Sequence, residues 1–169
     1  LDISGANVVR LDPVIDFSPE GWALPFQPLE TWATCWRGYF RANQDGVYAF
    51  TLGSDDGALL ELDNKPVCGA DQLQGYTEAR RTVELTRGLH VLKLRYFNNR
   101  GPGACRLLFS FPVEVEPRIV PRELLYPAGG PAEVGRPLIR SAAPDGAKRG
   151  ETVTLLGSGF SDIPTLNKV

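Results

Sequence analysis

The sequence has 169 residues, of which 43% are hydrophobic, and its formal net charge is −2. This length allows one full domain and part of a second, and the apolar fraction suffices for a buried core. A chain that is nearly neutral and has no basic run lacks the electrostatic signature of nucleic-acid binding. No stretch has the apolar length of a membrane-spanning helix, so we expect no membrane insertion in this segment. The chain contains no Met and begins within a pattern at Leu1, and we expect it to be a piece of a larger protein.

The first 34 residues predict little regular structure, because four prolines interrupt any helix or long strand: Pro13, Pro19, Pro25 and Pro28. Two apolar runs, at residues 8–11 and 14–17, could each form a short strand. The large apolar side chains of this region are expected to pack against a neighbouring surface: Trp22, Phe26, Leu29 and Trp32. For the tryptophans, Trp36 included, we favour packing over an exposed platform for stacking on sugars.

Clear alternation of apolar and polar residues begins at residue 35. Residues 35–41 alternate, residues 43–46 (Asn-Gln-Asp-Gly) have turn chemistry, and residues 47–52 alternate again. This pattern predicts a β-hairpin. Beyond an Asp-Asp turn, a further strand is predicted at residues 58–62, followed by a turn at residues 63–65.

The longest alternating run covers residues 89–97. Its apolar side chains are expected to face the core, with one irregularity at positions 91 and 92: Leu89, Val91, Leu92, Leu94, Tyr96 and Phe97. Residues 80–85 and 104–111 predict further strands. Prolines punctuate residues 112–121, so we expect an edge strand there and a closing anchor at residues 124–127.

No segment has a helical period over ten residues, so the predicted fold class is all-β, with antiparallel sheets packed as a sandwich or barrel. The composition divides the chain into three parts. Residues 1–127 form the β domain, and residues 128–137 are a linker rich in Gly and Pro. A new alternating pattern occupies residues 138–169, which are too few to close a sandwich of their own.

Three cysteines, Cys35, Cys68 and Cys105, lack the paired spacing of a zinc site. Their odd number permits at most one internal disulfide. A second interpretation, in which all three are small buried thiols, is equally compatible with the sequence. Cysteine usage therefore does not assign a redox compartment.

The most informative polar motif is Asp55-Asp56, which lies between two predicted strands. Neighbouring carboxylates repel each other unless solvent or a cation neutralises them, and calcium prefers carboxylate and carbonyl oxygens. Ser-Asp-Asp-Gly is also ordinary turn chemistry. The motif is thus a candidate metal site, with a simple turn as the alternative.

The order of motifs between Arg10 and Tyr126 resembles the protective-antigen fourteen-kilodalton (PA-14) domain. The matching segments include Trp-Arg-Gly-Tyr-Phe at 36–40 and Gly-Ser-Asp-Asp-Gly at 53–57, and the full set is 10–17, 36–40, 46–57, 60–67, 85–97 and 103–108. This resemblance implies a β-sandwich. The tail, residues 139–146 and 150–160 with their Gly-Ser-Gly-Phe element, is similar to the opening strands of an immunoglobulin-like IPT/TIG repeat, which implies a modular, extracellular or cell-surface parent.

In sugar-binding PA-14 domains, such as those of adhesins, two consecutive aspartates hold calcium, and a second loop adds an Asn side chain and backbone carbonyls. The resemblance implies the following set here: Asp55, Asp56, Asn98, and the carbonyls of Arg100 and Pro102. It also implies a cis peptide between the two aspartates. Vicinal hydroxyls of a glycan would complete the calcium shell, with Asn99 and Arg100 as further hydrogen-bonding groups. A plain polar loop tip is the alternative for Asn98 and Asn99.

We do not expect an enzyme. Glycoside hydrolysis needs two carboxylates across a cleft, whereas adjacent residues of one turn cannot flank a glycosidic bond. The only histidine, His90, lies within a predicted strand, which favours a structural or surface role. The alternative to glycan binding is a structural or protein-interaction module within a filament or large assembly.

Overall fold

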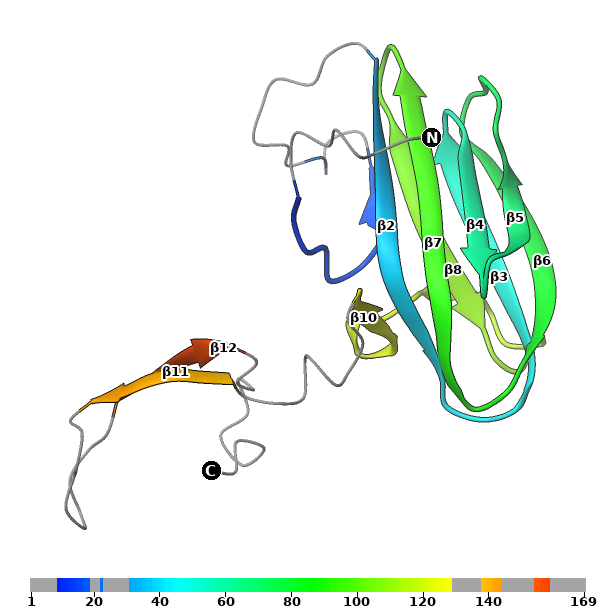
Figure 1. Ribbon diagram of the computed structural model, residues 1–169. Coiled ribbons are helices and arrows are strands. Elements are labelled where there is room, and N and C mark those ends of the chain that lie inside the picture. Colours follow the sequence, from blue (N-terminus) through cyan, green and yellow to red (C-terminus); the bar gives the residue numbers. More distant parts are fainter. Residues whose placement is uncertain (1–8, 19–21, 23–30, 129–137, 144–153, 159–169) are drawn as a thin grey trace. The chain divides into compact units, whose positions relative to one another are not determined.

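The computed structural model describes residues 9–18, 22, 31–128, 138–143 and 154–158 (Figure 1). The chain separates into two compact units, residues 1–128 and 129–169. The first unit contains two antiparallel five-stranded sheets and, within the described residues, one helical element, the 3₁₀ turn η1 (Arg122–Leu124). The predicted all-β antiparallel sandwich is therefore confirmed. No helix of the described ranges has the length and apolarity that crossing a bilayer requires.

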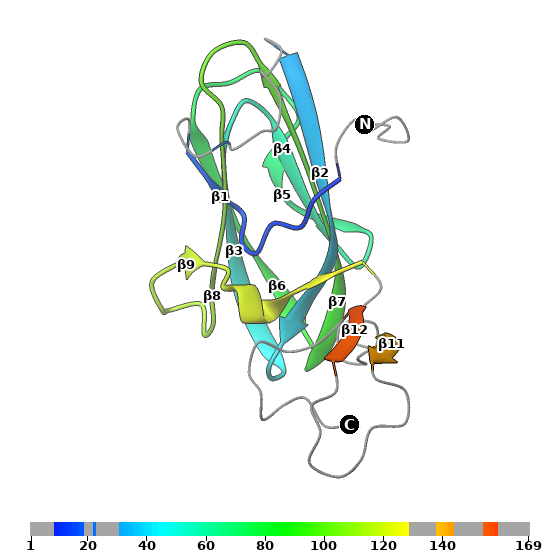
Figure 2. The same ribbon diagram turned by 90° about the vertical axis from the view of Figure 1, so that its left-hand side faces the viewer.

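The first sheet has the order β1-β8-β3-β6. A further strand, β9, also pairs directly with β8, at residues further along β8 than those that pair with β1 (Figure 2). Its strands are β1 (Asp16–Phe17), β3 (Gly46–Asp55), β6 (Thr77–Leu85), β8 (Ala104–Ser110) and β9 (Arg118–Ile119). The second sheet has the order β10-β2-β7-β4-β5. Its strands are β2 (Thr31–Ala42), β4 (Ala58–Leu62), β5 (Lys65–Ala70), β7 (Gly88–Asn99) and β10 (Leu125–Pro127).

The core lies between the two sheets because each contributes an apolar inner face. In β7 every second residue from Leu92 to Tyr96 is buried, as period-two alternation requires. Phe40 of β2 packs edge to face against Phe50 of β3, with 5.1 Å between the ring centroids. Such pairs add about 0.5–1.5 kcal/mol beyond the burial of apolar area. Aromatic side chains from the alternating runs thus fill the space between the two sheets and hold their inner faces together.

The predicted hairpin of residues 35–52 is wrong in its pairing. Both strands exist and a turn joins them, but β2 pairs with β7 and β10, whereas β3 pairs with β6 and β8. The turn therefore carries the chain from one sheet to the other. Nearly all of β3 is buried, since it is a central strand of its sheet. Alternation shows which face of a strand is apolar, and it does not identify the neighbouring strand.

The predicted inner face of residues 89–97 is partly wrong. The register of β7 against β2 runs without interruption from Asn99 to Gly88, so the expected irregularity is absent. His90 occupies an inward position, and Leu89 and Val91 are exposed. His90 is accommodated because its ring nitrogens lie 2.7 Å from Asp63 Oδ2 and 2.8 Å from the Thr86 carbonyl oxygen. A structural role for this histidine, as predicted, agrees with these contacts.

Several shorter predictions are also decided by the described residues. The edge strand expected after residue 112 is confined to β9, while residues 113–116 form no strand. The closing anchor at residues 124–127 is confirmed, because η1 leads into β10, which pairs with β2. Residues 9–12 form no strand. All three cysteines are free thiols, with Cys68 and Cys105 buried.

In the second unit, β11 (Leu138–Ala143) pairs with β12 (Thr154–Ser158) in an antiparallel ladder, with an irregularity between Ile139 and Ser141. The linker from residue 129 to 137 and the end of the Gly-Ser-Gly-Phe element lie outside the described residues, as do Phe26 and Leu29. The similarity of the tail to an IPT/TIG repeat stays a prediction.

Candidate functional site

Three connections between the sheets meet at one end of the sandwich, the upper end in Figure 1. They join β3 to β4, β5 to β6, and β7 to β8, so each leaves one sheet and enters the other. The strand register places them together, because Ser54 pairs with Thr77 and Asp55 pairs with Ala104. The Asp-Asp turn and the loop after β7, predicted as two halves of one site, therefore lie at the same end.

Asp56 connects all three loops. The residue is only 7% exposed. Oδ1 accepts a hydrogen bond from the backbone N–H of Gln74 at 3.2 Å, and Oδ2 accepts one from the backbone N–H of Asn99 at 2.7 Å. Hydrogen bonds from backbone N–H groups to a carboxylate are short and strong. Asp56 thus ties the three loops together at the centre of the candidate site.

Asp55 ends β3 and is partly exposed. Its peptide bond to Asp56 is cis, as the resemblance implied. Burial and repulsion from the Asp56 carboxylate raise the pKa of Asp55, while a hydrogen bond from the backbone of Tyr76 acts in the opposite direction. A cation beside the two carboxylates would remove the repulsion.

Asn98 is the buried amide of the site, with 2% exposure. Its Nδ2 donates to the Gly101 carbonyl oxygen at 3.2 Å, and its Oδ1 lies 3.4 Å from the Tyr96 hydroxyl oxygen. The chain passes very close to this side chain at Gly103, where an added Cβ would lie 2.7 Å from Asn98 Oδ1 and would overlap the Tyr96 hydroxyl. A glycine at this position therefore lets the loop close over Asn98.

The remaining predicted residues lie in the same loop. Asn99 contributes its backbone N–H to Asp56, and its side-chain oxygen accepts a hydrogen bond from the Thr31 hydroxyl at 3.1 Å. Arg100 and Pro102 are exposed, and Arg100 has a left-handed backbone conformation with φ of 72°. The loop carbonyl that meets the Asn98 side chain is that of Gly101, which lies between the two predicted carbonyl donors.

Gln74 and Tyr96 belong to this end of the molecule, although the sequence did not indicate a role for them. Besides its backbone bond to Asp56, Gln74 donates through Nε2 to the Ser54 hydroxyl and to the Asp56 carbonyl oxygen, both at 3.4 Å. The Tyr96 hydroxyl donates to the Asp55 carbonyl oxygen at 2.5 Å. Gln74 lies in a polar loop without a motif, and the apolar alternation assigned Tyr96 to the core, which is correct for its ring.

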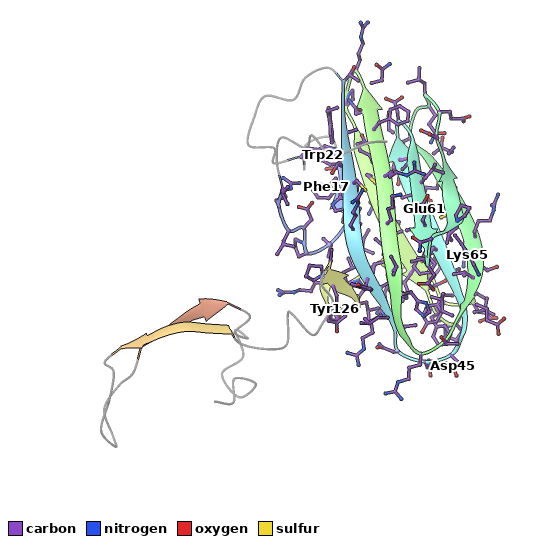
Figure 3. The ribbon with its side chains drawn as sticks, viewed as in Figure 1. Phe17, Trp22, Asp45, Glu61, Lys65 and Tyr126 are labelled. Carbon is purple, nitrogen blue, oxygen red and sulfur yellow. The ribbon has the colours of Figure 1, made fainter. Side chains whose placement is uncertain are left out.

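The tryptophans pack against the sandwich, as predicted. Trp22 stacks on Phe17 and on Tyr96, with ring centroids 4.4 and 5.3 Å apart, and it lies beside Phe17 next to β2 (Figure 3). Trp32 meets Trp22 edge to face at 4.5 Å. The indole N–H of Trp36 donates to Asp12 Oδ2 at 2.8 Å. These rings form an aromatic cluster beneath the second loop.

The donor set fits a hard cation. No group of three or more His, Cys, Asp or Glu side chains that could hold a metal occurs among the described residues. Any ion at this end would therefore depend on two carboxylates supplemented by amide and carbonyl oxygens. Calcium accepts such mixed oxygen shells with flexible geometry, whereas zinc favours His and Cys. The residues present thus fit calcium.

Comparison with known proteins identifies the family to which this fold belongs. The PA14 domain family model matches residues 24–117. The anti-sigma-I factor RsgI3 of Acetivibrio thermocellus is 28% identical over 134 residues, which are 78% of this chain and 20% of that protein. A solved anti-sigma factor domain-containing protein from Clostridium clariflavum is 32% identical, with a TM-score of 0.64 over 72% of this chain and 42% of its own.

A PA14 sugar-binding domain from an RTX adhesin shares the fold at 18% identity, with a TM-score of 0.56 over 63% of this chain and 60% of its own. The chain spans about a fifth of the curated relative's length and less than half of the solved anti-sigma factor chain. The family match covers more than half of the chain, and the two-sheet sandwich agrees with it. This chain belongs to the PA14 domain family.

Proposed function

We propose that this PA14 domain is a calcium-dependent carbohydrate-binding module of a larger extracellular or cell-surface protein. The observation that carries the proposal is the convergence of Asp55, Asp56 and Asn98 at one end of the sandwich. The 2.7 Å hydrogen bond from the Asn99 N–H to Asp56 Oδ2 joins the two loops directly. Residues separated by more than forty positions in the sequence are thereby held as one oxygen-rich site.

Each residue has a definable part in this function. Bound calcium would supply a positive centre to which adjacent sugar hydroxyls can coordinate. Asp55 and Asp56 would hold it with their carboxylates, and Asn98 Oδ1 with the carbonyls of Arg100 and Pro102 would add neutral oxygens. The side chains of Asn99 and Arg100 are exposed and close enough in sequence to hydrogen-bond further hydroxyls.

The comparisons support binding to a glycan, since the domain from the RTX adhesin is named a sugar-binding domain. At its level of identity this likeness concerns the fold, so the ligand is argued from the residues of the site. Catalysis is disfavoured by the same geometry, because the two carboxylates are consecutive residues of one turn and cannot lie on opposite sides of a glycosidic bond. We therefore propose a binding module without hydrolytic activity.

A calcium titration tests the metal part of the proposal. We expect the melting temperature to rise with added calcium and to fall again with chelator, because a ligand that binds only the native state stabilises it by about 2.7 kcal/mol at 100 times its Kd. Asp55→Asn should abolish the response. Glu114→Gln, an exposed acid in the β8–β9 connection, is the matched control and should keep the response. An unchanged melting temperature in the wild-type protein would refute calcium binding.

A glycan array tests the ligand. We expect a defined set of glycans to bind in calcium, and both chelator and Asp55→Asn to remove that binding. Glycan binding that persists in chelator would contradict the role of calcium but would still support glycan binding.

A second candidate function is a spacer or protein-interaction module. It is favoured by the relatives, two of which are named as anti-sigma factor proteins rather than adhesins. In that case the array would be blank under all conditions. The domain would instead bind neighbouring segments of its parent protein, and Asp55→Asn would not affect this binding.

A further inference from the structure

The Tyr96 hydroxyl lies where the two halves of the candidate site meet. Tyr96 belongs to β7 of the second sheet and is 1% exposed. Its hydroxyl donates to the Asp55 carbonyl oxygen at 2.5 Å, at the end of β3 in the first sheet. One buried oxygen therefore joins the strand that leads into the second loop to the carbonyl of the Asp55–Asp56 peptide itself.

This hydroxyl also determines how strongly Asn98 Oδ1 is hydrogen-bonded, because the two oxygens lie 3.4 Å apart. A tyrosine hydroxyl has a single proton to donate, and the 2.5 Å bond to Asp55 is much the shorter of the two. Asn98 Oδ1 consequently receives little from Tyr96, although it is the oxygen of a buried amide. Buried acceptors without a strong donor are uncommon in folded proteins. An oxygen in this condition is suited to accept a cation.

The aromatic cluster holds the Tyr96 ring and the second loop in place together. Trp22 stacks on the ring with an interplanar angle of 17°. Its indole N–H donates to the Gly103 carbonyl oxygen at 2.7 Å. Gly103 is the residue whose missing side chain makes room for the Tyr96 hydroxyl and Asn98 Oδ1. The ring, the loop and the amide therefore form one packed unit beneath the exposed loop residues.

From these contacts we propose that Tyr96 is a positioning residue of the calcium site, which holds the Asp55 backbone against the loop that carries Asn98, at the spacing that the ion requires. The inference rests on the proposed calcium binding. Loss of the Tyr96 hydroxyl should lower the affinity for calcium without removing any calcium ligand, because Tyr96 would not contact the ion. Removing residues that orient metal ligands typically lowers metal affinity by about 10- to 100-fold.

The chain contains a close control for this proposal. Tyr48 is also a buried tyrosine, 3% exposed, and its hydroxyl donates to a backbone carbonyl, that of Gln44, at 2.9 Å. Its ring stacks on Phe111 with 4.3 Å between centroids. It lies near the β2–β3 turn, at the opposite end from the site, where Figure 3 labels Asp45. Tyr96→Phe and Tyr48→Phe each remove one hydroxyl from a similar environment.

The experiment is an isothermal titration of calcium into the wild-type protein and the two variants, after their folding has been checked by thermal unfolding in chelator. We expect Tyr96→Phe to raise the Kd for calcium by about 10- to 100-fold and Tyr48→Phe to leave it unchanged. A Tyr96→Phe variant with the wild-type Kd would overturn this inference alone. A wild-type protein that binds no calcium would overturn the proposed function, and this inference with it.

A second variant covers the case in which Tyr96→Phe does not fold. Trp22→Phe keeps an aromatic ring against Tyr96 but removes the indole N–H that holds the Gly103 carbonyl. We expect it also to raise the calcium Kd, because the loop is then held by fewer contacts. If Trp22→Phe folds and binds calcium as tightly as the wild-type protein, the packing of Trp22, Tyr96 and Gly103 does not position the calcium ligands, and the inference is wrong.

Discussion

The same isosteric substitution at two adjacent positions should have opposite effects on the stability of the metal-free domain. Asp56→Asn replaces a buried carboxylate that accepts two backbone hydrogen bonds. Asp55→Asn replaces a partly exposed carboxylate whose pKa is raised by burial and by Asp56. We expect Asp56→Asn to destabilise the domain and Asp55→Asn to leave its stability unchanged or higher.

The size of the Asp56 effect follows from its hydrogen bonds. Each bond to the charged carboxylate contributes about 1.5–3 kcal/mol, whereas one to a neutral amide contributes about 0.5–1.5 kcal/mol. The amide of Asp56→Asn keeps an oxygen for one N–H and turns an NH₂ group towards the other, where two donors then oppose each other. The net loss should be about 2–4 kcal/mol, which lowers the melting temperature by on the order of 10 °C.

The Asp55 effect has the opposite sign because of its pKa. A raised pKa means that the native state holds the proton more tightly than the unfolded chain does, so this stabilisation is present at acid pH. It is lost as the pH rises through the raised pKa. At neutral pH the ionised Asp55 therefore contributes no such stabilisation and repels Asp56. Asp55→Asn removes that repulsion.

The assay is urea unfolding of both variants and the wild-type protein at pH 7 in chelator, followed by fluorescence. Equal free energies of unfolding for the two variants would refute the assignment of Asp56 as the structural and Asp55 as the exposed carboxylate. If only Asp55→Asn lost stability, the two assignments would have to be exchanged.

Two further predictions concern the opposite end of the sandwich and the second loop. Burial lowers the pKa of His90, but the hydrogen bonds to Asp63 and to the Thr86 carbonyl outweigh burial, so the pKa is raised. The stabilisation that protonated His90 contributes should thus be full below about pH 6.5 and should be lost as the pH rises through the native pKa. The single histidine permits a direct NMR titration, and a pKa at or below 6.5, or one unmoved by Asp63→Asn, would contradict the prediction. Gly103→Ala should weaken the calcium response, because its Cβ would overlap the Tyr96 hydroxyl, whereas Gly75→Ala, with open space around it, should not. Equal responses to calcium titration in both glycine variants would be evidence against close packing of the loop.

Much of the site could be predicted from the sequence because it lies in motifs. Asp55 and Asp56 are consecutive, and Asn98 directly follows a long alternating run, so the family resemblance identifies all three. Gln74 could not be predicted. It contributes through its backbone N–H, a group that every residue except proline carries, and the loop around it contains no motif.

Tyr96 and His90 illustrate a different difficulty. The alternating pattern correctly placed the Tyr96 ring in the core but contains no information about its hydroxyl, whose partner lies 41 positions away. For His90 the sequence left a structural and a surface role open, since the pattern did not include it in the apolar inner face. It is accommodated inside because Asp63 and the Thr86 carbonyl supply acceptors for both ring nitrogens.

By itself the sequence determined where most of the strands lie, that they form an all-β domain, and which turn carries the paired carboxylates. These features are local, since alternation and turn chemistry act over a few residues. Only the tertiary structure decided which strands pair, and it replaced the predicted hairpin by a crossing between sheets. The physical reason is that every strand offers the same backbone hydrogen-bonding groups, whatever its sequence. The pairing of strands is therefore decided by how the apolar faces of both sheets pack together. Three such crossings end at the same place, and this brings Asp56, Gln74 and Asn99 into contact.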